Sequence, residues 1–148
     1  MTGLMTPHTL SGVKLLNLDH VGIAVSDLDA AIDTYRVRYR VEPLYRETVD
    51  SEGVEQAMIP VGASFVQLLR PLKAETPIGR FLSKMGEGLH HVAYTVTSID
   101  EAVAHLSVTG AELVDLEPRI GARGHRSVFV RPDEVVGTLV ELVELNDV

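Results

Sequence analysis

Two histidines, His20 and His91, stand at the same position of a segment that occurs twice in this chain. The first copy reads LDHVGIAVSDLDAAI (residues 18–32), and the second, LHHVAYTVTSIDEAV (residues 89–103), follows about half of the 148 residues later. Histidine is the commonest metal ligand in proteins. A long internal repeat also predicts two equivalent structural units. Two units related by a pseudo-two-fold axis would bring the imidazoles to one centre, so the repeat predicts a metal site.

A polar residue interrupts the last apolar segment of each half at an equivalent place. These residues are Gln67, within Val-Gln-Leu-Leu, and Glu141, within Val-Glu-Leu-Val. A polar side chain in a buried strand is costly unless it finds a partner. With the two histidines they make a set of two nitrogen and two oxygen ligands, which leaves room on the ion for a substrate's oxygens. Each residue alone has an ordinary structural explanation, but all four at duplicated positions favour a metal site.

The remaining histidines are left out of this predicted site. His90 precedes His91, and side chains alternate between the two faces of a strand, so we expect His90 on the opposite face. His8, His105 and His125 are left out of the site as well.

Composition limits the kinds of ligand and partner. The chain has no cysteine, so the metal would be one divalent ion (Co, Zn, Ni, Mn or Mg) on imidazole and oxygen ligands. A net charge of −8 argues against nucleic-acid binding, which needs clustered Lys and Arg. No segment has the continuous apolar run of a signal peptide or a membrane span, so we expect a cytoplasmic protein with no membrane partner.

Hydrophobic periodicity predicts the same order of elements in both halves: a strand, a helix and three strands. In the first half these are residues 18–25, a helix after Ser26-Asp27, and strands at 42–49, 54–61 and 64–69. In the second half they are a strand at 89–96, a helix at 99–108, and strands at 112–116, 127–130 and 138–143. The predicted fold is α+β, with two tandem βαβββ modules forming a curved eight-stranded mixed sheet around a metal cleft. We expect residues 1–14 to be a flexible leader, 15–70 the first module, 71–88 a linker with a short helix, and 89–144 the second module.

Several motifs together resemble the methylmalonyl-CoA epimerase family of the vicinal-oxygen-chelate (glyoxalase/bleomycin-resistance) superfamily. They are LDHVGIAV, QLLRP, PIGRFL, GEGLHHVAY, EPRIGARGHR and GTLVEL, and the resemblance covers nearly all of residues 15–143. The resemblance places the family's metal ligands on His20, Gln67, His91 and Glu141, which are the residues that the repeat selects.

The resemblance implies an isomerase that epimerises a 2-alkylmalonyl-CoA, most simply methylmalonyl-CoA, and that works as a homodimer. A divalent metal would chelate the thioester carbonyl and the carboxylate of this acyl-CoA and acidify the proton on the carbon between them. A base would then remove that proton to give an enolate, and we expect Glu141 to be the principal base. Bacterial members commonly have a second acid/base, a glutamate, at the position of Gln56. A carboxamide cannot exchange a proton at neutral pH, so the second group is expected to differ here.

Three other functions of the same superfamily remain open at this point. A glyoxalase I-like isomerase would act on a glutathione hemithioacetal. A metal-dependent dioxygenase would use two histidines and one carboxylate on iron, and Gln67 would then be unexpected. A binding protein of the same fold would have no reason to keep all four ligands.

Overall fold

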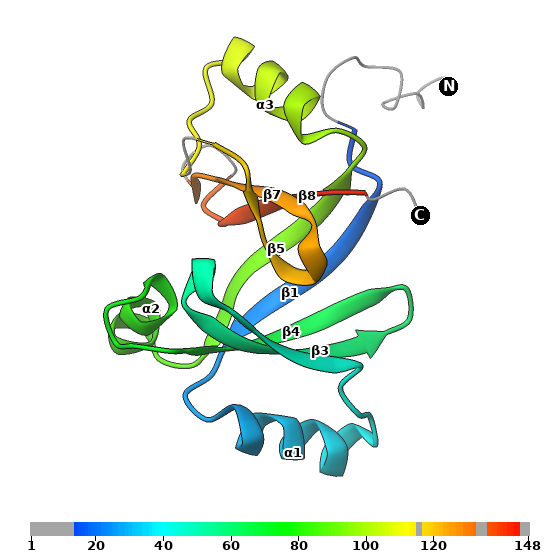
Figure 1. Ribbon diagram of the computed structural model, residues 1–148, viewed down its shortest axis with the longest axis vertical. Coiled ribbons are helices and arrows are strands. Elements are labelled where there is room, and N and C mark those ends of the chain that lie inside the picture. The colour runs from blue at the N-terminus through cyan, green and yellow to red at the C-terminus, as the bar shows by residue number, and fades with distance from the viewer. Residues whose placement is uncertain (1–13, 115–116, 133–135, 146–148) are drawn as a thin grey trace.

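Two copies of one strand–helix–strand–strand–strand unit form a single curved sheet in the computed structural model, which describes residues 14–114, 117–132 and 136–145 (Figure 1). The first unit consists of β1 (Asn17–Ala24), α1 (Leu28–Tyr39), β2 (Tyr45–Val49), β3 (Val54–Val61) and β4 (Ser64–Pro71). The second consists of β5 (Gly88–Val96), α3 (Ile99–Val108), β6 (Arg119–Ile120), β7 (Arg126–Val130) and β8 (Val140–Glu144). Helix α2 (Pro77–Met85) lies in the connection between them.

The strand order shows the pseudo-two-fold relation of the halves. The order is β2-β3-β4-β1-β5-β8-β7-β6, so it reads the same way outward from the central pair in each half. The central strands β1 and β5 are antiparallel, whereas β4 runs parallel to β1 and β8 parallel to β5. The predicted eight-stranded mixed sheet of two βαβββ modules is confirmed.

Each module covers the outer face of its half-sheet with its own helix. Side-chain caps begin these helices: Asp27 accepts a hydrogen bond from the Ala30 amide at 3.0 Å in α1, and Ser98 accepts one from the Glu101 amide at 3.1 Å in α3. Helices α1 and α3 lie at opposite ends of the molecule and bury separate apolar clusters against the sheet (Figure 1). The inner face between them is therefore left for other side chains.

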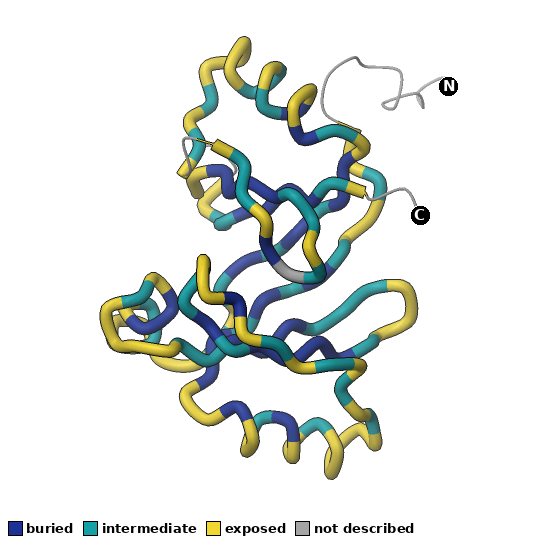
Figure 2. Tube along the Cα trace, in the orientation of Figure 1, coloured by how far each residue is buried: buried dark blue, intermediate teal, exposed yellow. Residues whose placement is uncertain are grey.

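Strand alternation places the polar residues of the buried strands on this inner face. In β4, Leu68 packs with the α1 cluster, and its neighbour Gln67 is turned to the other side. In β8, Leu142 packs with the α3 cluster, and its neighbour Glu141 is likewise turned inward. Figure 2 shows that the middle of the sheet is buried while the helices expose their outer sides.

One expected strand differs in the structure, and the expected leader lies almost entirely outside the described residues. A regular strand over 112–116 was expected, but only Leu113 forms a bridge there, with Val130, and residues 115–116 are not described. The edge strand β6 lies later, at Arg119–Ile120. Residues 1–13 of the expected leader fall outside the described residues. Among the described helices, none is long and apolar enough to cross a membrane.

Candidate metal centre

Three of the predicted ligands meet in a small triangle of buried atoms. The Nε2 atoms of His20 and His91 lie 3.1 Å apart, and Glu141 Oε1 lies 3.1 Å from the first and 3.3 Å from the second. Ligands bound at about 2.2 Å and at right angles to one another lie about 3.1 Å apart. The triangle therefore has the size expected of three neighbouring ligands on one divalent ion.

Gln67, the fourth predicted ligand, lies on β4 beside the same central strand. Gln67 pairs with Gly22 on β1, and Gly22 pairs with His91 of β5 on its other side. The amide nitrogen of Gln67 donates to Gln56 Oε1 at 2.5 Å, while its Oε1 is buried and has no hydrogen-bond partner among the described residues. An unpaired buried oxygen is costly, and a cation would satisfy it. The residues fit a divalent ion, and ligation by Gln67 stays a prediction.

The residue that precedes each histidine lies within hydrogen-bond distance of its Nδ1 atom, the ring nitrogen that is not part of the triangle. Asp19 Oδ2 lies 2.7 Å from His20 Nδ1, and His90 Nδ1 lies 2.9 Å from His91 Nδ1. The pairing of β1 with β5 is irregular at both places, between Leu18 and His20 and next to His91. In a regular strand, Asp19 and His90 would point to the face opposite their histidine neighbours. The bulges turn each of them to the same face as its neighbour. Metal-binding histidines usually have such a partner, which fixes the ring.

The expectation that His90 faces away from the site is wrong. Strand alternation fails at the bulge, so the His90 and His91 rings lie 5.1 Å apart, at 90° to each other. His90 also packs edge-on against Phe81 of α2, with ring centroids 4.9 Å apart. The one available signal in the sequence was the repeat itself, which aligns His90 with Asp19.

The electrostatics of the cluster follow from burial and from these contacts. Burial would raise the pKa of Glu141, but hydrogen bonds to both histidines hold it well below its usual range. Burial opposes charge on His20, yet hydrogen bonds to Asp19 and Glu141 raise its pKa to about 9. Burial lowers the pKa of His91, and it lowers that of His90 to about 4. At neutral pH the carboxylate is thus ionised and His91 neutral, the forms in which they ligate a metal, whereas His20 holds a proton that it would release on binding the ion.

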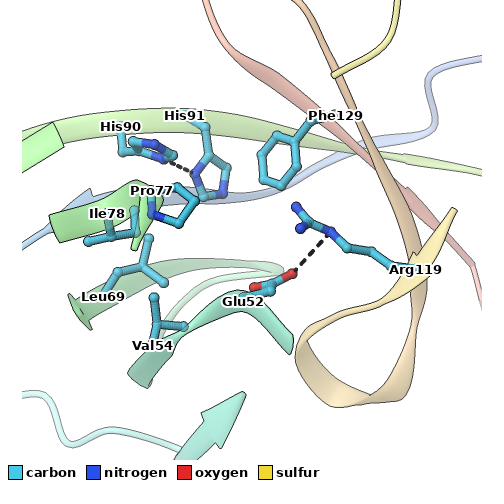
Figure 3. Close-up of a pocket in the computed structure, with 9 residues that line it drawn as sticks. All are labelled: Glu52, Val54, Leu69, Pro77, Ile78, His90, His91, Arg119 and Phe129. Atoms are coloured by element: carbon cyan, nitrogen blue, oxygen red, sulfur yellow. Dashed lines mark hydrogen bonds and ion pairs between the residues drawn. The ribbon is translucent and has the colours of Figure 1, made fainter. Parts of the chain in front are cut away.

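A small cavity of about 50 Å³ opens beside His91 (Figure 3). Its walls are mostly apolar, with Phe129 facing the His91 ring at 5.3 Å between centroids. On the side away from His91, Arg119 lies with its guanidinium 4.9 Å from the Phe129 ring centroid, and its Nε is 3.7 Å from Glu52 Oε2. The sequence indicated only a turn at Glu52, so this carboxylate was missed.

Gln56, the position of the family's second acid/base, lies fully buried on the inner face of β3. Its amide nitrogen donates to Glu47 Oε1 at 2.8 Å, and its oxygen accepts from Gln67. Both ends of this side chain are therefore engaged with neighbouring strands. This arrangement suits a residue that positions Gln67.

Comparisons with known proteins agree with the fold. The family model of the Glyoxalase/Bleomycin resistance protein/Dioxygenase superfamily matches residues 19–129. An uncharacterized protein of Bacillus subtilis, YqjC, is 39% identical over 127 residues, which cover 86% of this chain and 91% of that protein. The ethylmalonyl-CoA/methylmalonyl-CoA epimerase of Cereibacter sphaeroides is 37% identical over 130 residues, which cover 86% of this chain and 97% of that enzyme.

A solved structure extends the similarity to three dimensions. A variant of Streptomyces coelicolor methylmalonyl-CoA epimerase, in complex with 2-nitronate-propionyl-CoA, superposes with a TM-score of 0.86 at 37% identity. The match covers 90% of this chain and all of that one. The likeness therefore includes both modules and the inner face between them.

Proposed function

The chain belongs to the methylmalonyl-CoA epimerase family of the glyoxalase/bleomycin resistance protein/dioxygenase superfamily, and we propose that it is a metal-dependent epimerase of methylmalonyl-CoA or a close 2-alkylmalonyl-CoA. The observation that carries the proposal is the buried triangle of His20, His91 and Glu141 in this fold. The similarity to epimerases over nearly the whole chain supports the choice of reaction.

His20, His91 and Glu141, with Gln67 as the fourth ligand, would hold one divalent ion. When bound, the ion would act as a Lewis acid toward the two substrate oxygens that flank C2 and would lower the pKa of the proton on that carbon. The protein orients its two imidazoles through Asp19 and His90, so the ligand atoms are in place before any substrate arrives.

The cavity beside His91 suits the small acyl head of the substrate. Val54, Leu69 and Ile78 form an apolar wall that would accept the methyl group. The cationic side chain of Arg119 would favour the carboxylate. A groove of about 410 Å³ shares His90 and His91 with this cavity and continues along Phe81. We assign this groove to the pantetheine arm of the acyl-CoA.

Glu141 has one oxygen for the ion and one for the proton. Its Oε1 belongs to the ligand triangle, whereas its Oε2 is turned toward the space above Gly121. A carboxylate in this place can remove the C2 proton from one face, and a positioned base is worth about 10²–10⁴-fold in rate. Gln56 cannot serve the other face, because an amide does not exchange protons at neutral pH.

The experiment that tests this function uses the purified protein, stripped with a chelator and reloaded with Co²⁺ or Zn²⁺. Single enantiomers of methylmalonyl-CoA are incubated in deuterium oxide, and C2 is followed by NMR and by chiral analysis. We expect both enantiomers to take up deuterium and to interconvert, only with metal present. His105→Ala, which changes a helix histidine outside the site, should behave like the wild type. No metal-dependent deuterium uptake from either enantiomer would exclude the epimerase.

A further inference from the structure

Epimerisation requires a proton donor or acceptor on each face of a planar enolate, and Glu141 accounts for one face. We propose that Glu52 is the second acid/base, an assignment that rests on the proposed epimerase function. Glu52 ends the short 3-10 turn Asp50–Glu52, just before β3. The next residue, Gly53, has a φ of 68°, and this left-handed turn directs the chain into the inner strand.

The Glu52 side chain points into the cavity beside His91. It is 14% exposed, and Figure 3 shows its carboxylate on the same side of the cavity as Arg119, with the His91 ring opposite. Arg119 Nε lies 3.7 Å from Glu52 Oε2, close enough to orient the carboxylate. Among the described residues that line this cavity, Glu52 is the one carboxylate.

Glu52 and Glu141 line two different cavities, and both carboxylates lie close to Gly121. A Cβ atom built on Gly121 would lie 3.0 Å from Glu52 Oε2 and 3.8 Å from Glu141 Oε2. The two carboxylates come from different modules, and because both Oε2 atoms lie close to this point they are no more than about 7 Å apart. A substrate carbon held between these two oxygens, in front of the Gly121 backbone, would have one carboxyl group toward each face.

Three other carboxylates near the inner face lie outside the wall of this cavity. Glu47 accepts hydrogen bonds from the Gln56 amide and from the backbone of Arg123. Asp19 is held between His20 and Arg123. Glu55, on the same strand as Gln56, pairs with Arg46 and Arg70. None of these three lines the cavity beside His91.

The proton transfers balance without an oxidant or a further reactant. One of the two carboxyl groups begins ionised and the other protonated. The ionised group takes the C2 proton as the C2–H bond breaks, and the electron pair stays on the substrate as an enolate. The protonated group then gives its proton to the opposite face of C2, which forms the new C2–H bond. Proton exchange with water restores the starting state of both carboxyl groups.

The test compares Glu52→Gln with the wild type and with the control Glu55→Gln, all loaded with metal and supplied with each enantiomer separately in deuterium oxide. We expect Glu52→Gln to bind metal like the wild type but to lose inversion by about 10²–10⁴-fold. It should still exchange the C2 proton of the enantiomer that faces Glu141, and not that of the other enantiomer. Glu55→Gln should invert both. Glu52→Asp, which keeps the carboxyl group, should recover part of the inversion.

The outcomes separate this assignment from the function on which it rests. Inversion by Glu52→Gln within about threefold of the wild type would overturn the assignment and leave the epimerase intact. Equal loss of exchange from both enantiomers, with metal content and circular dichroism unchanged, would show that Glu52 only shapes the cavity and would also overturn it. A wild type that exchanges neither enantiomer would remove the epimerase function and the assignment together.

Discussion

The ring of His91 lies over Gly22, so closely that a Cβ atom at position 22 would be 2.2 Å from His91 Cε1. Gly22 on β1 pairs with His91 on one side and with Gln67 on the other. Its counterpart in the repeat, Ala93 on β5, pairs with His20 and Glu141. Each central strand thus places one small residue between two ligands, and the ligand side chains close over it.

Gly22→Ala should therefore displace the His91 ring, because a contact of 2.2 Å cannot be accommodated without movement. Misplacing one ligand should weaken metal binding by at least about tenfold, in line with the effect of disturbing the support of a ligand. Isothermal titration with Zn²⁺ or Co²⁺ measures this change. Val21→Ala, on the same strand but facing the other way, is the control and should bind metal normally. Equal affinities for both variants would contradict the packing described above.

The positions of the four predicted ligands were readable from the sequence because they depend on local rules. Alternation within β4 and β8 puts Gln67 and Glu141 on the inner face, and duplication pairs His20 with His91. Three of the four, His20, His91 and Glu141, meet as a triangle. His90 could not be placed in this way, since a bulge is set by the register between β1 and β5.

His90→Leu should reveal the contribution of that bulge. The substitution removes the nitrogen that lies 2.9 Å from His91 Nδ1 while keeping an apolar contact with Phe81. We expect metal affinity to fall by about 10–100-fold, because the His91 ring loses the partner that fixes its orientation. His105→Leu, on α3, serves as the matched histidine control. Unchanged affinity in His90→Leu would mean that packing alone holds the ring.

His91→Ala removes a ligand outright and should abolish metal binding and epimerisation together. The remaining side chains keep their places on separate strands, so the fold should persist, as judged by circular dichroism. Metal content after dialysis and deuterium uptake at C2 are the two measurements. Retention of stoichiometric metal in this variant would place the ion away from the triangle.

Burial raises the pKa of Tyr45 on β2 to about 12, compared with about 10 for a tyrosine in an unfolded chain. Between these values the unfolded chain loses the phenolic proton and the folded protein keeps it. Stability should consequently fall as the pH rises from 10 toward 12. Tyr45→Phe has no such proton, so its urea midpoint should fall less than that of the wild type over this range. Parallel curves for the two proteins would contradict the raised pKa.

Glu52 illustrates a second limit of sequence analysis. It sits in the segment Asp-Ser-Glu-Gly, which indicates a turn and nothing more. Its position depends on its proximity to Arg119 and Gly121, two residues that are far from it in the sequence. Such contacts arise only when the two modules come together. The irregular course before β6 has the same cause, since its one bridge at Leu113 depends on β7.

The last prediction concerns the direction of the hydrogen bonds that end at Gln67. A carboxylate only accepts, so Glu47 draws the amide nitrogen of Gln56 toward itself, at 2.8 Å. Gln56 must then present its oxygen to the Gln67 nitrogen, which leaves Gln67 Oε1 as the end of the amide that can ligate a cation.

Gln56→Met keeps the length of the side chain and removes both hydrogen bonds. The Gln67 amide then has no reason to turn its oxygen rather than its nitrogen toward the ion. We expect metal affinity to fall by about 10–100-fold, and the unpaired Gln67 nitrogen to lower stability by about 1–3 kcal/mol. Glu55→Gln, the adjacent residue on the opposite face, should leave metal affinity unchanged and, through its partly exposed ion pairs with Arg46 and Arg70, lower stability by at most about 1 kcal/mol. If Gln56→Met lost stability but bound metal as tightly as the wild type, Gln67 would not be a ligand, and His20, His91 and Glu141 alone would hold the ion.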